Sequence, residues 1–216
     1  KLAVDTLLSM PNQRTAIGFR DYMLMLLLYS TAVRINELLT LKIHNITMDC
    51  SKPHMIVIGK GRKKRPIPLL AKPVQYLKKY LTEYHPNPDN AEALLFNSKS
   101  KGIYTPMSAE NVNKMLKRYA KMAHDKCSDV PLDLHAHQFR HAKASHWLEN
   151  GMNIAQISYL LGHENIQTTM VYLDITTEQE EKALETLEDE NQRIVGKKWK
   201  SAKGKMELEA FLGLYK

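Results

Sequence analysis

The sequence predicts a mainly α domain with a small antiparallel β-sheet, an α+β fold. Apolar residues recur at helical spacing through most of the 216 residues. One stretch, residues 46–68, is instead β-prone and contains a Gly-Lys-Gly turn. Gly and Pro, nine of each, are scattered at the boundaries between these segments. We therefore expect one domain over residues 1–174, followed by a C-terminal helix, a basic linker and a tail segment over residues 175–216.

The spacing of the apolar residues predicts where each helix and strand lies. Helices are predicted at residues 14–31, 35–41, 74–84, 108–124, 137–149, 153–161 and 165–172. Strands are predicted at residues 54–58 and 65–68, joined by a turn at Gly59-Lys60-Gly61. Ser108 and Asn153 favour helix N-termini, whereas Gly162 favours a helix end. The two strands are expected to form a hairpin that carries several basic residues.

The C-terminal residues differ in charge from the rest of the chain. Residues 174–190 carry eight acids against Lys182 alone, and residues 193–205 carry six cations and no acid. The apolar residues of the last segment, 206–216, are too few to be buried by its own folding. We expect this tail to pack on this molecule or on a neighbouring protomer.

The charge balance favours a polyanionic partner. The chain has 31 Lys and Arg against 23 Asp and Glu, a net charge of +8. Outside residues 174–190 the balance is 30 cations against 15 acids. Such a surplus attracts polyanions, with nucleic acid first among them, although a merely basic protein is the alternative.

The sequence excludes several other classes. The longest apolar run has six residues, 23–28, whereas a bilayer-spanning helix needs about 18. Cys50 and Cys127 show neither metal-ligand spacing nor a disulfide framework, so we expect a reducing compartment, the cytoplasm, in association with the nucleoid. The chain begins at Lys1 without a signal peptide, and we expect it to be a fragment.

Five short segments carry side chains suited to phosphate chemistry. They are Thr31-Ala-Val-Arg34-Ile-Asn-Glu37-Leu, Ile58-Gly-Lys60-Gly-Arg-Lys-Lys-Arg65, His137-Gln-Phe-Arg140-His141, Leu160-Leu-Gly-His163 and Thr168-Thr-Met-Val-Tyr172. Cleaving DNA without a metal needs a nucleophile, a base, cations for the non-bridging oxygens and an acid for the leaving oxygen. These segments hold a candidate for each role.

In this order and spacing the five segments resemble the catalytic domain of tyrosine recombinases, the family of phage and conjugative-transposon integrases and of Xer chromosome-dimer resolvases. Members carry T-G-L-R-x-x-E-L, a hairpin G-K-G turn, H-x-x-R-H and L-G-H segments, and a Tyr nine residues after that last His. Here that Tyr is Tyr172. The resemblance covers about residues 14–174 and implies the tyrosine recombinase catalytic-domain fold.

The resemblance implies DNA strand cleavage and rejoining through a 3′-phosphotyrosyl link, with Tyr172 as nucleophile. Arg34 and Arg140 would clamp the scissile phosphate, because a guanidinium can donate two parallel hydrogen bonds to phosphate oxygens and stays charged. His163 would be a second hydrogen-bond donor to the phosphate. A phenol has a pKa of about 10, so Tyr172 would need cations and a base to be activated.

The remaining candidates take supporting roles. The resemblance implies that His137 is the general base or contacts the phosphate, and that Lys60 protonates the leaving 5′-hydroxyl. Lys63 and Lys64 are alternatives for that acid. Glu37 would orient Arg34 or its neighbours, and His141 would support the other residues of the H-x-x-R-H segment. The expected DNA contacts of the hairpin are Arg62, Lys63, Lys64 and Arg65.

A zinc site is the main alternative for the histidines, because His137 and His141 are spaced i,i+4 on a helix face. A third ligand is not evident, and Arg140 would repel a metal ion. We expect neither a metal nor another cofactor.

The sequence departs from the family at Ala32 and Val33, where Gly and Leu are common, a change we expect to affect packing only. Most relatives carry an N-terminal core-binding domain before this one, and we expect it not to be part of this chain. The expected partners are double-stranded DNA, three further copies in a homo-tetramer on recombining DNA, and an accessory directionality factor. Without DNA we expect a monomer or weak oligomer, with no membrane contact.

Integration or excision of a mobile element is the favoured role, because the long C-terminal tail differs from the short Xer ending. The alternatives are an Xer-type resolvase, a type IB topoisomerase-like activity and a non-catalytic DNA-binding protein.

Overall fold

The structure, a computed structural model, describes residues 1–170 except 101, 164 and 166. The helices are α1 (Leu2–Leu8), α2 (Ala16–Thr31), α3 (Ile35–Leu39), α4 (Ala71–Glu83), α5 (Ala109–His124), α6 (Ala136–Glu149) and α7 (Ile154–Leu161), with 3₁₀ turns η1 (Ile43–Asn45) and η2 (Lys60–Arg62). The strands are β1 (Ile46–Thr47), β2 (His54–Ile58), β3 (Lys64–Pro68), β4 (Asn97–Ser100) and β5 (Ile103–Pro106). The predicted α+β fold is confirmed.

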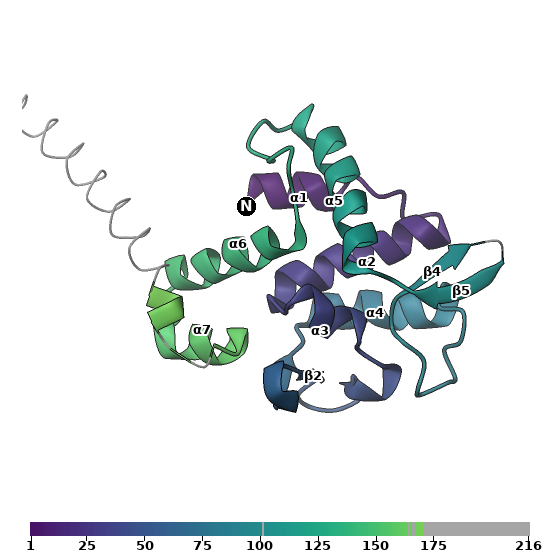
Figure 1. The fold of residues 1–216 in the computed structure, drawn as a ribbon, viewed down its shortest axis with the longest axis horizontal. Helices are drawn as coiled ribbons and strands as arrows, with labels where there is room; N and C mark the ends of the chain where they lie inside the picture. The colour runs from purple at the N-terminus through teal and green to yellow at the C-terminus, as the bar shows by residue number, and fades with distance from the viewer. Residues whose placement is uncertain (101, 164, 166, 171–216) are drawn as a thin grey trace, which may run out of the picture. The chain divides into compact units, whose positions relative to one another are not determined.

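Helix α2 runs through the middle of the described part, between α6 and α4 (Figure 1). Its N-terminus is capped by Thr15, whose hydroxyl accepts a hydrogen bond from the backbone N–H of Gly18 at 3.1 Å. Nearly every later residue of α2 is buried, because neighbours cover it on several sides. Phe19, for example, stacks on Tyr84 beyond the end of α4, with 4.6 Å between ring centroids.

Helix α2 ends at Ala32 in the left-handed backbone conformation, with φ 53°. Non-glycine residues pay about 1–2 kcal/mol there, because Cβ approaches the next carbonyl oxygen. The expectation that Ala32 affects packing only is therefore wrong, since the substitution also strains the backbone. The turn is tight enough to place Arg34 only three residues after the last residue of α2.

The predicted hairpin lies in a sheet of order β1-β2-β3, with antiparallel pairing. Val57 pairs with Arg65 and Ile58 with Lys64, so the turn at residues 59–63 presents Lys60 at its tip. The backbone N–H of Gly59 donates to the carbonyl oxygen of Lys63 at 2.9 Å. Gly61 has φ 71°, which glycine adopts without strain.

Some elements differ from the sequence predictions. Helix α1, β1 and the β4–β5 hairpin were not predicted, and α4 begins at Ala71 rather than near residue 74. Pro73 is tolerated there because the first N–H groups of a helix have no intrahelical partner. Residues 167–170 are helical. The rest of the predicted 165–172 helix, the boundary at residue 174, the acidic stretch, the basic linker and the tail lie outside the described residues.

Among the described residues, we find no helix with both the length and the apolar character to cross a bilayer.

Asp21 joins three elements from inside the core. Its side chain is fully buried on α2 and accepts hydrogen bonds from Arg20 at 2.6 Å and from the Tyr119 hydroxyl of α5 at 3.0 Å. Arg20 in turn donates to the carbonyl oxygen of Asn97 on β4 at 3.0 Å. Buried charges of this kind persist because each has its partner.

We expect Asp21→Ala to lower the free energy of unfolding by about 3 kcal/mol, because it leaves a largely buried guanidinium without its counter-charge. Urea unfolding at pH 7 measures the change. Asp89→Ala, at an exposed position, is the matched control and should leave the midpoint unchanged. An Asp21→Ala variant as stable as that control would contradict the assignment.

Candidate active site

The Arg34 segment begins α3. Arg34 is the N-cap residue, and its backbone N–H donates to Oε2 of Glu37 at 2.9 Å. The guanidinium of the same residue donates to Oε1 of Glu37 at 3.2 Å. The Glu37 side chain is only 5% exposed, whereas that of Arg34 is 42% exposed. Glu37 therefore fixes both the backbone and the side chain of Arg34.

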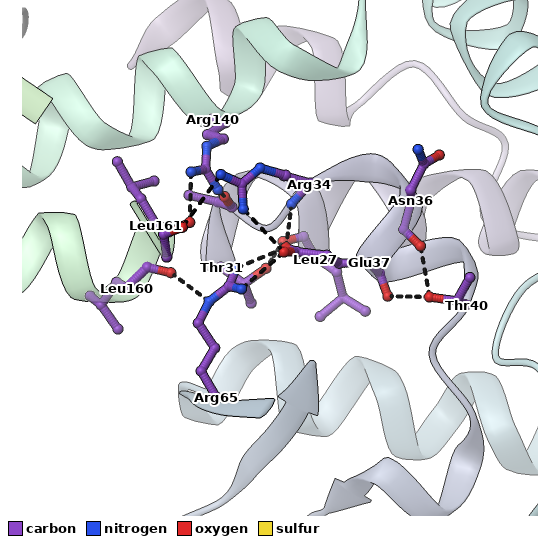
Figure 2. Close-up of polar contacts among 12 residues, drawn as sticks. Leu27, Thr31, Arg34, Asn36, Glu37, Thr40, Arg65, Arg140, Leu160 and Leu161 are labelled. Carbon is purple, nitrogen blue, oxygen red and sulfur yellow. Dashed lines mark hydrogen bonds and ion pairs between the residues drawn. The ribbon is translucent and has the colours of Figure 1, made fainter. Parts of the chain in front are cut away.

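Arg65 reaches the same carboxylate from β3 (Figure 2). Its Nη1 donates to Oε1 of Glu37 at 2.9 Å and its Nη2 donates to Oε2 at 2.8 Å, a bidentate pair. Its Nε donates to the carbonyl oxygen of Leu160 in α7 at 3.3 Å. Burial alone would raise the pKa of Glu37, but the Arg65 hydrogen bond, the Arg34 N–H and both positive charges outweigh it and hold that pKa below its ordinary value.

Arg140 is buried between two helix ends (Figure 2). It lies on α6 with 2% exposure, and its guanidinium donates to the carbonyl oxygens of Ala32 at 2.9 Å and Leu161 at 2.6 Å. These carbonyls belong to the C-terminal ends of α2 and α7, where a helix carries partial negative charge. The two helix ends therefore stabilise the buried cation.

His163 follows the end of α7 at Gly162, which has φ 65°. Its Nδ1 lies 2.7 Å from Oγ1 of Thr169, a fully buried hydroxyl that fixes the orientation of the ring. Burial and the positive charges of Arg140, Arg34 and Arg65 lower the pKa of His163 to about 4. The imidazole is therefore neutral near pH 7.

His137 lies in the first turn of α6 and packs edge-to-face on His141, with ring centroids 4.4 Å apart. Burial lowers the pKa of both side chains, and the charge of Arg140 adds to this effect in each case. For His137, the proximity of His141 contributes as well. Both rings are therefore mainly neutral at pH 7.

Two adjoining hollows bring the predicted residues together, and we call them the cationic cleft. The larger, about 520 Å³, is lined by Arg34, Lys60, His137 and Arg140 among others. The smaller, about 230 Å³, is lined by Arg34, Lys60, Lys63, Arg65, Tyr159 and His163 among others. Since Arg34 and Lys60 line both, the hollows meet there. Glu37 supplies the negative charge among these cations, so the cleft is suited to an anion such as phosphate.

The four basic residues of the hairpin differ in how exposed their side chains are. Arg62, Lys63 and Lys64 are exposed, as expected for DNA contacts, whereas the Arg65 side chain is 11% exposed and contacts protein groups. DNA contact by these residues stays a prediction. The burial pattern along β3 would have singled out Arg65, because it lies two residues before buried Ile67 and so on the same face of the strand.

The nucleophile and a metal site are the remaining predictions for this region. Tyr172 lies outside the described residues. Within the described part of the chain, no group of three or more His, Cys, Asp or Glu is arranged to hold a metal. Sequence reasoning missed Thr169, although its spacing of six residues from His163 was visible, and the helix-end carbonyls that stabilise Arg140.

Residues 2–179 match the Phage integrase family. Tyrosine recombinase XerC of Chlamydia caviae is 31% identical over 177 residues, which cover 80% of this chain and 53% of that protein. Tyrosine recombinase XerA of Pyrococcus horikoshii is 34% identical over 171 residues, covering 79% and 55%. The chain thus spans about half the length of these relatives.

Two solved structures share the fold. XerH site-specific recombinase bound to palindromic difH substrate, a post-cleavage complex, matches with a TM-score of 0.68 at 24% identity, over 86% of this chain and 52% of that one. The Tn1549 transposon integrase in complex with circular intermediate DNA matches with a TM-score of 0.60 at 23% identity, over 78% and 57%. Similarity at this level of identity shows the fold alone.

We expect the ring signals of His163 to titrate with a midpoint near pH 4 in an NMR titration. Because the folded pKa lies below the ordinary 6.5, the unfolded state takes up this proton first. Stability is therefore lost as the pH falls from about 6.5 towards 4. His163→Gln should show a shallower loss over the same range in urea unfolding. A midpoint near 6.5 would contradict the burial and charge that the structure gives this ring.

Proposed function

The chain belongs to the phage integrase family, as its motifs predicted, and from this premise we propose that it carries the catalytic domain of a tyrosine recombinase. The proposal is supported chiefly by the gathering of Arg34, Lys60, His137 and Arg140 around one cleft, with His163 in the adjoining hollow. The substrate is double-stranded DNA, and the reaction is strand cleavage and rejoining.

Binding of the scissile phosphate uses the two arginines that line the larger hollow. Arg140 is held in place by the two helix ends, and Arg34 is held by Glu37. A phosphodiester carries one negative charge on its non-bridging oxygens, which suits two prearranged guanidinium groups. Neither group reorganises much when charge builds on the non-bridging oxygens, so both stabilise the transition state.

His163 acts as a neutral hydrogen-bond donor to a phosphate oxygen. Its Nδ1 contacts the Thr169 hydroxyl, so its Nε2 is the nitrogen assigned to the phosphate. A bound anion also offsets the surrounding positive charge, which raises the pKa of the imidazole towards its ordinary value. A bound phosphate therefore increases the fraction of rings that carry a proton on both nitrogens.

In the cleavage step, the Tyr172 hydroxyl oxygen attacks the phosphorus, forming a Tyr–O–P bond while the bond from phosphorus to the 5′-oxygen breaks. His137 accepts the phenol proton, and Lys60 at the exposed hairpin tip donates a proton to the leaving oxygen. The products are a 3′-phosphotyrosyl ester and a free 5′-hydroxyl. Another strand's 5′-hydroxyl reverses the step without ATP, because the ester keeps the energy of the broken phosphodiester.

The wider biological role is proposed from the sequence expectations. Integration or excision of a mobile element is our proposal, with four copies assembled on recombining DNA and a directionality factor as accessory partner. The relatives named above include both Xer recombinases and a transposon integrase.

Covalent trapping tests the activity. The chain is incubated in EDTA with a pool of nicked, randomised duplexes, and a denaturing gel reveals any protein–DNA adduct. We expect an adduct with the wild type and none with Tyr172→Phe, because the nucleophilic oxygen is gone.

Tyr104→Phe is the matched control, since Tyr104 is 46% exposed on β5 and lines neither hollow of the cleft. It should form the adduct at the wild-type level. Two results would contradict the proposal: an adduct that persists in Tyr172→Phe, or no adduct with the wild-type chain at any salt concentration.

A further inference from the structure

We propose that Arg65 is a positioning residue that fixes the Lys60 turn and the His163 turn relative to Arg34, and that it is not a DNA contact. The inference rests on the proposed function for its catalytic consequence. Its structural part concerns three segments that are distant in sequence: α3, the hairpin turn with β3, and the end of α7.

The Arg65 guanidinium uses all three of its nitrogens on protein acceptors. Nη1 and Nη2 donate to the two oxygens of Glu37 in α3, and Nε donates to the Leu160 carbonyl in α7. The acceptors lie in two different elements, so the planar fork links them rigidly. A lysine has a single nitrogen and cannot make this set of contacts.

Two glycines are shaped around this guanidinium. A Cβ on Gly162 would lie 2.8 Å from Cζ and Nη1 of Arg65, closer than real contacts allow. A Cβ on Gly59 would lie 3.2 Å from Nη1 of the same side chain. Lys60 directly follows Gly59, and His163 directly follows Gly162. Arg65 therefore packs against the backbone immediately before each of the two proposed catalytic residues.

The charge of Arg65 is already balanced. Its side chain is 11% exposed and that of Glu37 is 5% exposed, and the two form a bidentate ion pair. A DNA phosphate would have to displace the Glu37 carboxylate to bind this guanidinium. Arg62, three residues earlier, is exposed on the hairpin and has no such constraint. The two arginines therefore serve as a matched pair for an experiment.

The experiment compares Arg65→Lys and Arg65→Gln with Arg62→Lys and Arg62→Gln. Affinity for a random-sequence duplex is measured against salt concentration by fluorescence anisotropy. Adduct yield is measured on the nicked, randomised pool. Backbone amide spectra are recorded for the free proteins, and urea unfolding verifies that each variant is folded.

We expect both Arg65 variants to keep the wild-type salt slope and to lose about 100-fold in the rate of adduct formation, because small misplacement of reacting groups is that costly. The amide signals of Lys60 and His163 should shift in both. Arg62→Gln should reduce the slope by about 0.9, the contribution of one phosphate contact. Arg62→Lys should keep the wild-type salt slope, since it keeps the charge.

Gly59→Ala is a second variant that keeps Arg65 and its charge. Its added methyl crowds Nη1, so it should also slow adduct formation without changing the salt slope.

Wild-type behaviour of Arg65→Lys in adduct yield and amide spectrum would overturn the proposal, because charge alone would then suffice. A reduced salt slope in Arg65→Gln would overturn it as well, in favour of a DNA contact. If the wild type forms no adduct, the proposed function fails, while the salt slopes and amide spectra still decide the positioning role.

Discussion

The site depends on the buried carboxylate of Glu37. Arg34, Arg65 and Arg140 all line the cationic cleft, and three guanidinium groups in a half-enclosed space repel one another unless something offsets their charge. Glu37 contacts two of them, and the carbonyl oxygens of two helix ends contact the third. Removing one partner of such a pair leaves a buried charge without compensation, which is strongly destabilising.

The positive charge that Glu37 leaves uncompensated determines the electrostatic properties of the cleft. Glu37 offsets part of the positive charge, and burial together with the remaining charge lowers the pKa values of His137 and His163. Under the proposed function, a phosphodiester supplies the missing negative charge and at the same time raises the pKa of both rings. On that proposal, binding of the substrate and the change in the pKa of the two imidazoles are the same electrostatic event.

The sequence predicted most of the fold, and five of its candidate site residues, Arg34, Lys60, His137, Arg140 and His163, line the cationic cleft. Helical periodicity located α2, α5, α6 and α7, and the Gly-Lys-Gly turn located the hairpin. The β4–β5 hairpin was missed because β4 is polar and all four residues of β5 are exposed, so no alternation of apolar and polar residues marks it. Arg65 was grouped with its basic neighbours because composition does not reveal which way a side chain points. In the structure it lies on the same face of β3 as buried Ile67 and contacts Glu37.

The pH dependence of stability in Glu37→Gln tests most directly whether this carboxylate holds the site together. The folded pKa of Glu37 lies below the ordinary 4.5, so its ionised form stabilises the protein above that value, and the stabilisation is lost as the pH falls through the folded pKa. The measurement is the free energy of unfolding of the wild type and of Glu37→Gln, in urea, from pH 3 to 7. The account predicts that the wild type is more stable near pH 7 and that its advantage shrinks below about pH 4.5. A difference that does not vary with pH, or no difference at all, would contradict it.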